Sequence, residues 1–317
     1  MNILRLGAVL LAACLAWPAA AEDLESLKGA VSWPPVSATP LRFQKSPSGD
    51  ATSVSAGDLT VYFVDVGQGD AEYIELPDGK RALIDGGPPN GKLAEFLSRR
   101  GIAKIDYLVL THPHLDHFGG LPWVFDNLQV DNFYDNRLDN PSGAGDDEVR
   151  AKAAAEPGCT TRYPLEGEAL DWGKGIQIQV LNSCQEPQAK EKARDINACS
   201  IVLKLTHAGA AMLFMGDAGA SVEARLVARY GASLRADVLK VGHHGSATAS
   251  TASFLDEVRP LLSYIEVGVG NNYGHPRQET LARLQAVGTA VSRTDLGGTL
   301  VLSDHQPAAY AIAGHAD

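Results

Sequence analysis

The chain has 317 residues, of which 45% are hydrophobic and 21% are charged, and its formal net charge is −11. This length is enough for one large domain or two small ones with a sizeable core. The acidic balance weighs against a protein that coats nucleic acid by charge alone, because affinity for phosphates needs a basic surface. It leaves open an enzyme that holds one or two phosphates through metal ions, whose charge is absent from the sequence count.

Residues 1–21 have the pattern of a bacterial export signal. Arg5 precedes an apolar run over residues 6–15, and three alanines at 19–21 form a small-residue cleavage site. We therefore expect a mature chain that is periplasmic or secreted. The alternative is a lipoprotein, since residues 11–14 resemble a lipobox with Cys14 as the lipid anchor. We favour free release, because the apolar stretch before Cys14 is short.

The folded part of the chain is expected to begin near residue 58. Residues 22–57 are rich in Ser, Ala and Pro and predict a spacer. Alternating and apolar runs then predict strands over 59–64, 71–76, 81–84, 105–110, 176–181, 200–206, 211–215, 237–241, 261–267 and 299–302. Helices are expected over 92–100, 121–127, 148–155, 219–229 and 278–287, with weak structure elsewhere in 136–175. Two strand-rich halves, each followed by helices, predict two packed sheets with helices outside.

Three cysteines lie beyond the export signal, namely Cys159, Cys184 and Cys199. An exported protein permits disulfides, but an odd count leaves at least one cysteine without a partner in the chain. One hypothesis is a bridge between Cys159 and Cys184, which lie in the same irregular region. The other is three unbridged cysteines.

Four potential metal ligands lie within six residues, directly after an expected buried strand: His112, His114, Asp116 and His117. Residues two apart in an extended segment project to the same side, so His112 and His114 can meet one ion. Asp116 and His117, on the following turn, can reach a neighbouring ion. Imidazole and carboxylate ligands suit zinc, manganese or iron. A solvated polar loop is the alternative, but this loop holds three of the nine histidines of the chain together with an acid.

The pattern His-x-His-x-Asp-His at 112–117, followed by Gly119-Gly120, resembles the signature of the metallo-β-lactamase superfamily. Residues 63–71, 239–246 and 272–276 resemble blocks of the extracytoplasmic domain of ComEC-type DNA-uptake proteins, and residues 83–87 match the second strand of the superfamily. The resemblance implies an α+β fold, a four-layer αββα sandwich with one or two metal ions at one edge of the sheets. We expect residues 58–317 to form this hydrolase domain, without the transmembrane channel of ComEC-type proteins.

The resemblance also implies further ligands. Asp217, at the end of a strand, is expected to bridge two ions through its two oxygens, with a helix cap as the alternative role. His243, after the next strand, is expected on the second ion, with His275 as its rival. If His243 binds metal, we expect His275 to face the substrate. His244 is expected to point away from His243, toward phosphate or in support of a ligand.

One position departs from many superfamily members, which have a ligand histidine between the first cluster and Asp217. Asn197 stands there instead, and His207, at the far end of the following strand, is expected to be remote. An amide oxygen is a weaker ligand than imidazole, so a harder ion such as manganese becomes plausible. Asp85 is expected to orient the histidine loop by hydrogen bonds. Asp65 is placed near the same edge without a defined role, as is Asp70.

The resemblance implies a metal-dependent hydrolase with one or two divalent ions, Zn or Mn. Such ions lower the pKa of a bound water and orient the hydroxide for in-line attack on a phosphodiester. We expect Asp116, His244 and His275 in catalysis, and Asn197, Ser200 and Ser246 around the bound ions and phosphate. The first hypothesis is an exported phosphodiesterase or nuclease acting on single-stranded DNA. The alternatives are a small-molecule esterase, for a phosphocholine ester, lactone or lactam, and a non-catalytic surface-binding module.

Overall fold

The computed structural model describes residues 58–140, 145–184 and 195–303. The predicted export signal, the Cys14 lipid anchor and the spacer lie outside the described residues. The structure contains two seven-stranded sheets. No helix in the described ranges is both long enough and apolar enough to cross a membrane.

The first sheet has the strand order β14-β1-β2-β3-β4-β5-β6. Its strands are β1 (Thr60–Phe63), β2 (Glu72–Glu75), β3 (Arg81–Ile84), β4 (Lys104–Val109), β5 (Gln129–Tyr134), β6 (Thr160–Arg162) and β14 (Leu300–Ser303). From β3 to β6 the neighbours are parallel. The segments that follow these strands therefore leave the sheet at one edge.

The second sheet has the order β13-β12-β11-β10-β9-β8-β7. Its strands are β7 (Ala169–Leu170), β8 (Ile176–Asn182), β9 (Val202–His207), β10 (Ala210–Phe214), β11 (Val238–Lys240), β12 (Leu262–Ile265) and β13 (Ala290–Arg293). Here β10 to β13 are parallel. In β8, buried Ile176, Ile178 and Val180 alternate with exposed glutamines, because successive side chains point to opposite faces of a sheet.

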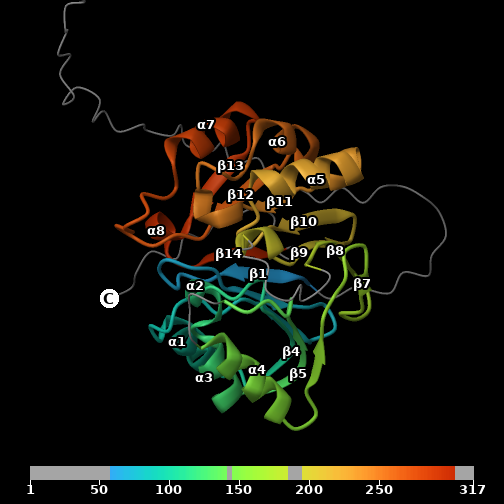
Figure 1. Ribbon diagram of the computed structural model, residues 1–317, viewed down its shortest axis with the longest axis vertical. Coiled ribbons are helices and arrows are strands. Elements are labelled where there is room, and N and C mark those ends of the chain that lie inside the picture. The colour runs from blue at the N-terminus through green and yellow to red at the C-terminus, as the bar shows by residue number, and fades with distance from the viewer. Residues whose placement is uncertain (1–57, 141–144, 185–194, 304–317) are drawn as a thin grey trace, which may run out of the picture. The chain divides into compact units, whose positions relative to one another are not determined.

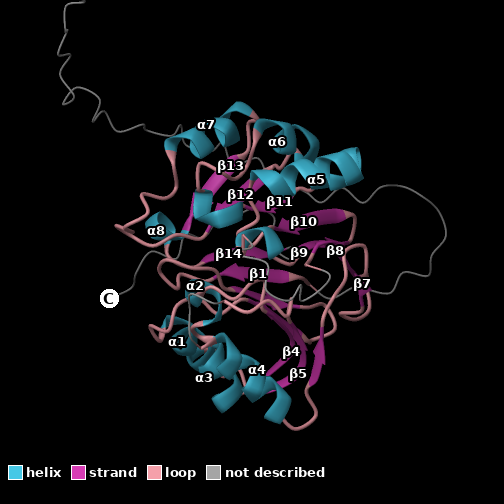
Figure 2. Cartoon of the chain, in the orientation of Figure 1, coloured by secondary structure: helices cyan, strands magenta, loops and turns pink. Residues whose placement is uncertain are grey.

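Helices cover the outer face of each sheet (Figure 1, Figure 2). The first sheet is covered by α1 (Lys92–Arg99), α3 (Leu121–Asn127) and α4 (Asp146–Ala155), and the second by α5 (Ala220–Tyr230), α6 (Ala252–Val258) and α7 (Gln278–Ala286). Two single-turn helices, α2 (Leu115–Phe118) and α8 (Thr294–Gly297), follow β4 and β13. The result is the predicted four-layer αββα sandwich.

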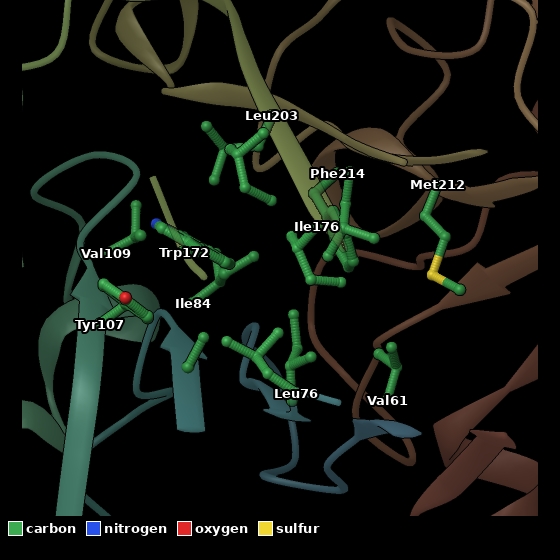
Figure 3. Close-up of a cluster of buried hydrophobic side chains, with 14 of the residues drawn as sticks. Val61, Leu76, Ile84, Tyr107, Val109, Trp172, Ile176, Leu203, Met212 and Phe214 are labelled. Carbon is green, nitrogen blue, oxygen red and sulfur yellow. The ribbon is translucent and has the colours of Figure 1, made fainter. Parts of the chain in front are cut away.

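The main core lies between the two sheets (Figure 3). Phe63 of β1 stacks on Tyr264 of β12 with ring centroids 4.1 Å apart. Tyr107 of β4 stacks on Trp172 at 5.4 Å. These contacts bury aromatic surface between the two sheets.

Several elements are not predicted by the sequence, and all of them depend on their neighbours. β5 carries Asp131 and Asn132 in its centre, so it lacks a clean apolar alternation. It forms because β4 and β6 pair with it on both sides. The short strands β6, β7 and β13 and the helix α6 were also missed.

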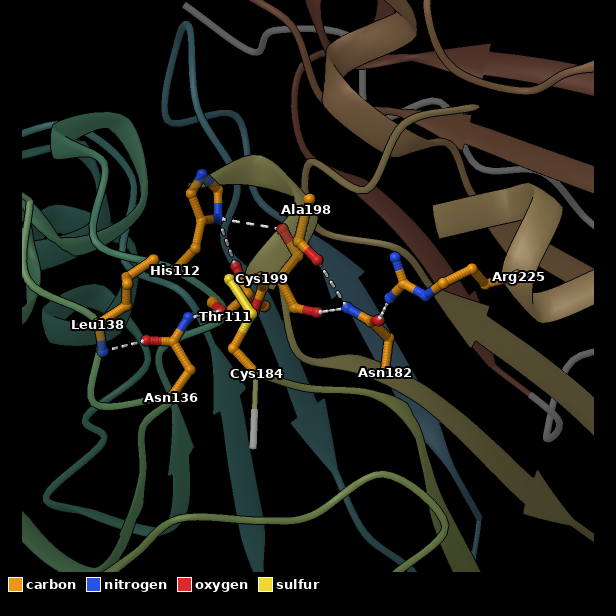
Figure 4. The surroundings of a disulfide bond; sticks show 10 residues. Thr111, His112, Asn136, Leu138, Asn182, Cys184, Ala198, Cys199 and Arg225 are labelled. Carbon is orange, nitrogen blue, oxygen red and sulfur yellow. Dashed lines mark hydrogen bonds between the residues drawn. A yellow bond between two sulfur atoms is a disulfide. The ribbon is translucent and has the colours of Figure 1, made fainter. Parts of the chain in front are cut away.

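The disulfide joins Cys184 to Cys199, with Cα atoms 5.0 Å apart, so the predicted bridge between Cys159 and Cys184 is wrong (Figure 4). Cys184 follows β8 and Cys199 precedes β9, and these strands are antiparallel neighbours. Cys159 has a free thiol and precedes β6, in the other sheet. The disulfide pairing depends on which strands are neighbours in the sheet. The spacing of the cysteines along the sequence does not reveal this.

Candidate metal centre

Residues from both sheets meet at the edge where β4, β10 and β11 end. The histidine loop 112–117 follows β4, Asp217 follows β10, and His243 and His244 lie in η3 (Gly242–Gly245) after β11. Because β10 and β11 are parallel neighbours, the segments after them leave the sheet together. Imidazoles and carboxylates from three distant parts of the chain therefore converge.

Two glycines allow backbone segments to approach each other closely here. A Cβ atom on Gly120 would collide with the carbonyl oxygen of Gly86, and one on Gly69 would collide with that of Asp116. The amide of Asp70 also donates to the carbonyl of Asp116 at 3.2 Å. Neighbouring backbone thus occupies the space that a side chain would take, which requires glycine at both positions.

Asp85 supports the histidine loop from the end of β3. One of its oxygens accepts a hydrogen bond from the amide of Thr111 at 2.7 Å. The other accepts from the Thr111 hydroxyl at 2.6 Å and lies 2.7 Å from Nδ1 of His117. The hydrogen bonding predicted for Asp85 is confirmed. Because Asp85 occupies Nδ1, the His117 ring presents Nε2 to the centre, in the arrangement by which carboxylates commonly support metal-binding histidines.

The two oxygens of Asp217 face two different groups of histidines. Oδ2 lies 3.6 Å from Nε2 of His112 and 3.8 Å from Nε2 of His243. Oδ1 lies 3.4 Å from Nε2 of His117 and 3.5 Å from Nε2 of His244. A carboxylate placed in this way could bridge two ions.

The group on the Oδ2 side includes His112 and His114. Nε2 of His112 lies 3.0 Å from Nδ1 of His114. The other nitrogen of His112 lies 3.0 Å from the hydroxyl of Thr111 and 3.4 Å from that of Ser200 (Figure 4). These contacts direct Nε2 of His112 toward Asp217.

The group on the Oδ1 side adds Asp116 and His244, whose Oδ2 and Nε2 atoms lie 3.3 Å apart. Nε2 of His117, Nε2 of His244 and Oδ1 of Asp217 are all buried, and none has a hydrogen-bond partner within the described part of the chain. Nitrogen and oxygen ligands about 2.0–2.2 Å from one ion are separated by about 3.0–3.6 Å. The observed spacings match this separation, so the residues fit a divalent cation.

The charges of the group also favour a cation. Burial lowers the pKa of His112, and the nearby His117 lowers it further, which favours the neutral imidazole that ligates metals. Burial opposes charge on His244, but Asp217 and Asp70 outweigh it and raise its pKa to about 10. Burial likewise opposes ionisation of Asp217, yet the charges of His244 and His117 hold its pKa well below the ordinary value. Positive charge at this position therefore stabilises the buried carboxylates.

The family model of the metallo-β-lactamase superfamily matches residues 64–265, a range that includes the histidine loop, Asp217 and the histidine pair at 243 and 244. The chain belongs to the metallo-β-lactamase superfamily. Two solved structures have a similar fold. Tm1679, described as a metal-dependent hydrolase of the β-lactamase superfamily, has a TM-score of 0.54 and 12% identity and covers 77% of this chain and 98% of its own. YhfI from Bacillus subtilis has a TM-score of 0.52 and 13% identity, with coverages of 78% and 99%. These likenesses confirm the fold alone.

Three curated relatives confirm the resemblance to ComEC-type proteins. ComE operon protein 3 of Bacillus subtilis (strain 168) is 32% identical over 262 residues, which are 76% of this chain and 32% of that protein. Competence protein ComA of Neisseria gonorrhoeae is 30% identical over 251 residues, 78% of this chain and 33% of that protein. Recombination protein 2 of Haemophilus influenzae is 31% identical over 243 residues, 74% and 27% of the two chains. The chain thus spans about a third or less of the length of these relatives.

Neither His243 nor His244 has an extended backbone. His243 and His244 both have a φ of 50°, a strained value for residues other than glycine. The side chain of His244 is buried and faces Asp116, whereas that of His243 is 29% exposed and lies near the other oxygen of Asp217. The two turned residues therefore serve opposite sides of Asp217, and His244 occupies the place predicted for His243.

Asn197 and His275 lie beside His243 at the rim of the centre. Nδ2 of Asn197 is 3.4 Å from the ring nitrogens of His243, and the rings of His243 and His275 are 5.6 Å apart. Partial burial, followed by the nearby His243 and His244, lowers the pKa of His275 to about 4. The predicted substrate-facing role of His275 stays a prediction, and its half-buried position at the rim is compatible with it.

Ser200, Ser246 and His207 lie at different distances from the metal centre. Ser200 is fully buried behind His112, and its hydroxyl accepts the amide of Asp217 at 3.1 Å, so it supports ligands and cannot reach a bound phosphate. The hydroxyl of Ser246 lies 3.0 Å from that of Thr248, and its predicted phosphate contact stays a prediction. His207 lies at the far end of β9, with Nδ1 2.9 Å from the carbonyl oxygen of Gly175, remote from the centre as expected.

Sequence reasoning placed Asp70 near this edge without a defined role, and it missed Lys240. Asp70 has an oxygen 3.0 Å from Nδ1 of His244, which is also 3.0 Å from the carbonyl oxygen of Glu266. Lys240 forms an ion pair with the other oxygen of Asp70. The available signal was a lysine at the end of the otherwise apolar strand β11. Asp65, in contrast, only closes a turn at the amide of Gly67 and pairs with an exposed lysine.

Proposed function

We propose that this chain is an exported, metal-dependent phosphodiesterase that cleaves single-stranded DNA. The observation that carries the proposal is the set of buried ligand atoms facing the two oxygens of Asp217, at spacings that match a shared cation. The resemblance to ComEC-type DNA-uptake proteins supports nucleic acid as the substrate class. Export rests on the sequence of residues 1–21, with a lipid anchor at Cys14 as the alternative.

In this proposal Asp217 belongs to two ligand sets. One set is His112, His114 and Asp217, with His243 at its open side; the other is Asp116, His117, His244 and Asp217. Zinc or manganese ions, when bound, lower the pKa of water and neutralise charge on a phosphoryl oxygen. The role of second-site ligand passes from His243, the sequence-based choice, to His244.

The residues of the chain then orient the reactants. Asp85 and Asp70 fix the rings of His117 and His244 from behind. Asp116 is 30% exposed, so its carboxylate can accept a hydrogen bond from the attacking water. The His117 and His244 charges lower the pKa of Asp116 against the effect of burial, which keeps it an acceptor at neutral pH.

The rim of the centre offers hydrogen-bond donors for the phosphate. His243 and Asn197 lie next to each other there, and His275 stands beside them with its Nδ1 without a partner among the described residues. Such donors stabilise the charge that gathers on phosphoryl oxygens during in-line attack. In this proposal Asn197 and His275 contact the substrate, and His243 stays at the open side of the first ligand set.

The test uses purified chain loaded with Mn²⁺ or Zn²⁺ and three substrates: an oligodeoxynucleotide, a phosphocholine ester and a chromogenic β-lactam. We expect chelator-sensitive cleavage of the oligodeoxynucleotide. Asp217→Asn should abolish it, and Asp70→Asn should weaken metal affinity about 10–100-fold, the usual effect of a residue behind a ligand. Asp65→Asn, a carboxylate from the same sequence block, is the matched control and should change neither.

The outcomes separate the candidate functions. Cleavage of only the phosphocholine ester or the lactam would identify a small-molecule esterase. A chain that purifies without metal and cleaves none of the three, with either ion supplied, would be a surface-binding module, and the phosphodiesterase proposal would be wrong.

A further inference from the structure

We propose that a cavity next to the metal centre binds one nucleotide unit of a single-stranded nucleic acid, a proposal that rests on the phosphodiesterase function above. The cavity has a volume of about 410 Å³ and lies beyond the carboxyl ends of β5 and β6. Small-ligand sites commonly occupy about 300–1,000 Å³. The residues that matter here are Asn136, Arg137, Arg162, Tyr163, Glu168 and Ser183, which all line the cavity.

The cavity and the metal centre share a wall. β5 and β6 are the first and second neighbours of β4, which leads into the histidine loop. At a strand spacing of about 4.8 Å, the cavity is therefore displaced by about 5–10 Å along the sheet edge. Nδ2 of Asn136 donates to the carbonyl oxygens of Thr111, at 3.1 Å, and Cys199, at 3.0 Å (Figure 4). Cys184, bonded to Cys199, also lines the cavity.

Two guanidinium groups, those of Arg137 and Arg162, line the cavity together with two carboxylates, those of Asp135 and Glu168. Arg137 and Arg162 are exposed, and neither has a carboxylate within 4.0 Å in the described ranges. Asp135, which also lines the cavity, is paired with Arg150 at 2.7 Å. Guanidinium groups bind phosphate through two parallel hydrogen bonds, so the two arginines suit a backbone phosphate.

A flat stacking surface adjoins these charges. The guanidinium carbon of Arg137 lies 3.6 Å from the ring centroid of Tyr163, whose side chain is 39% exposed. Unpaired bases stack on aromatic rings and on guanidinium planes. Arg137 also has a φ of 61°, and such strain is typical of functional sites. Asn136 holds this turn, because its Oδ1 accepts the amide of Leu138 at 2.9 Å.

The remaining polar groups suit a base. The Ser183 hydroxyl is buried, with the residue 7% exposed, and it has no hydrogen-bond partner among the residues that the structure describes. Glu168 uses Oε2 to accept the amide of Leu165 at 2.9 Å, and Oε1 can accept from an exocyclic amine of a base. In this proposal the arginines contact the phosphate, Tyr163 stacks on the base, and Ser183 and Glu168 bind the edge of the base.

The binding test uses the full chain in excess EDTA with a fluorescein-labelled single-stranded octadeoxynucleotide, followed by anisotropy. Arg162→Ala and Tyr163→Ala should each weaken binding about tenfold, whereas Tyr163→Phe retains the ring and should bind as the wild type does. Arg162→Ala should also reduce the slope of log K against log salt by about 0.7, the value for one lost phosphate contact on a single strand.

Arg100→Ala is the matched control for charge. Arg100 follows α1 and stacks on Tyr62 of β1 with its guanidinium carbon 4.2 Å from the ring centroid. β1 is separated from β5 by three strands of the same sheet. The control therefore removes an equal charge and a similar ring contact away from the cavity, and it should leave both affinity and salt slope unchanged.

A second measurement uses metal-loaded chain. The cavity variants should raise KM for the oligodeoxynucleotide about tenfold and leave kcat/KM for bis(p-nitrophenyl) phosphate unchanged, because that ester is too small to span both sites. If the wild type binds the octamer in EDTA through the cavity but cleaves neither substrate, the phosphodiesterase proposal fails and the cavity assignment stands. If Arg162→Ala and Tyr163→Ala bind as tightly as the wild type, or if the wild type does not bind, the nucleotide cavity is refuted.

Discussion

Replacing Lys240 with methionine tests how the buried charges behind the metal centre are held. Its ammonium group pairs with Asp70 and lies 3.9 Å from Oε1 of Glu72, and all three side chains are buried. Glu266 joins them, since one oxygen from each of the three acids lies within 4.8 Å of the others. Burial opposes the charge on Lys240, but the three acids raise its pKa above the ordinary value.

We expect a large loss in the free energy of unfolding, because the Lys240 ammonium group is close to several buried acids. Removing one partner of a buried ion pair costs about 3–5 kcal/mol, out of a typical free energy of unfolding of about 5–15 kcal/mol. Methionine fills a similar volume, so loss of packing adds little. Glu72 and Glu266 can remain protonated, because burial raises the pKa of both. We therefore expect the free energy of unfolding to fall by about 3 kcal/mol, the lower end of the range.

The assay is urea unfolding in EDTA at pH 7, followed by circular dichroism. Lys204→Met is the matched control: Lys204 lies on β9, and its ammonium group donates to the carbonyl oxygens of Ser233 and Arg235 on the protein surface. Losing these two hydrogen bonds leaves no buried charge without a partner, so Lys204→Met should lower the free energy of unfolding less than Lys240→Met does. The double variant Asp70→Asn with Lys240→Met also removes the carboxylate that Lys240→Met leaves without a partner. Its loss in free energy of unfolding should therefore be at least about 1 kcal/mol smaller than the sum of the losses in the two single variants.

Two results would refute this reasoning. One is a Lys240→Met variant that loses no more stability than Lys204→Met. The other is strict additivity in the double variant, which would mean that Asp70 and Lys240 do not interact energetically.

Three further predictions follow from the same structure. Mn²⁺ or Zn²⁺ at 100 times its dissociation constant should raise the free energy of unfolding by about 2.7 kcal/mol. The Asp217→Asn variant should not show this increase. If it does, the metal binds elsewhere. Burial raises the pKa of Glu72 from 4.5 to about 8, so the folded chain keeps a proton that the unfolded chain has lost, and stability should fall as pH rises between these values. Glu72→Gln should make that slope shallower by about 1.4 kcal/mol per pH unit in urea titrations from pH 5 to 8, and an unchanged slope would contradict the assignment. Reducing the Cys184–Cys199 disulfide, which closes a separation of 15 residues, should cost about 3 kcal/mol of unfolding free energy; Cys159→Ser is the control without effect, and an equal loss in that variant would count against the pairing.

The sequence by itself determined the layers of the fold and the first half of the metal centre. Apolar alternation, as in β8, is a local property that follows from the two-residue repeat of a strand. The histidine loop is also local, since four ligand candidates occupy one turn after β4. Asp85 and Asp217, which follow β3 and β10, were expected from the resemblance to the metallo-β-lactamase superfamily.

Only the tertiary structure decided which distant groups meet. His244 rather than His243 faces Asp116 because both residues turn into positive φ after β11, which no apolar pattern records. The ion pair of Lys240 with Asp70 spans 170 residues and joins the two sheets. The disulfide depends on the antiparallel pairing of β8 with β9. Such contacts are set by how two sheets pack against each other, and residues far apart in the chain carry no local periodicity that reports it.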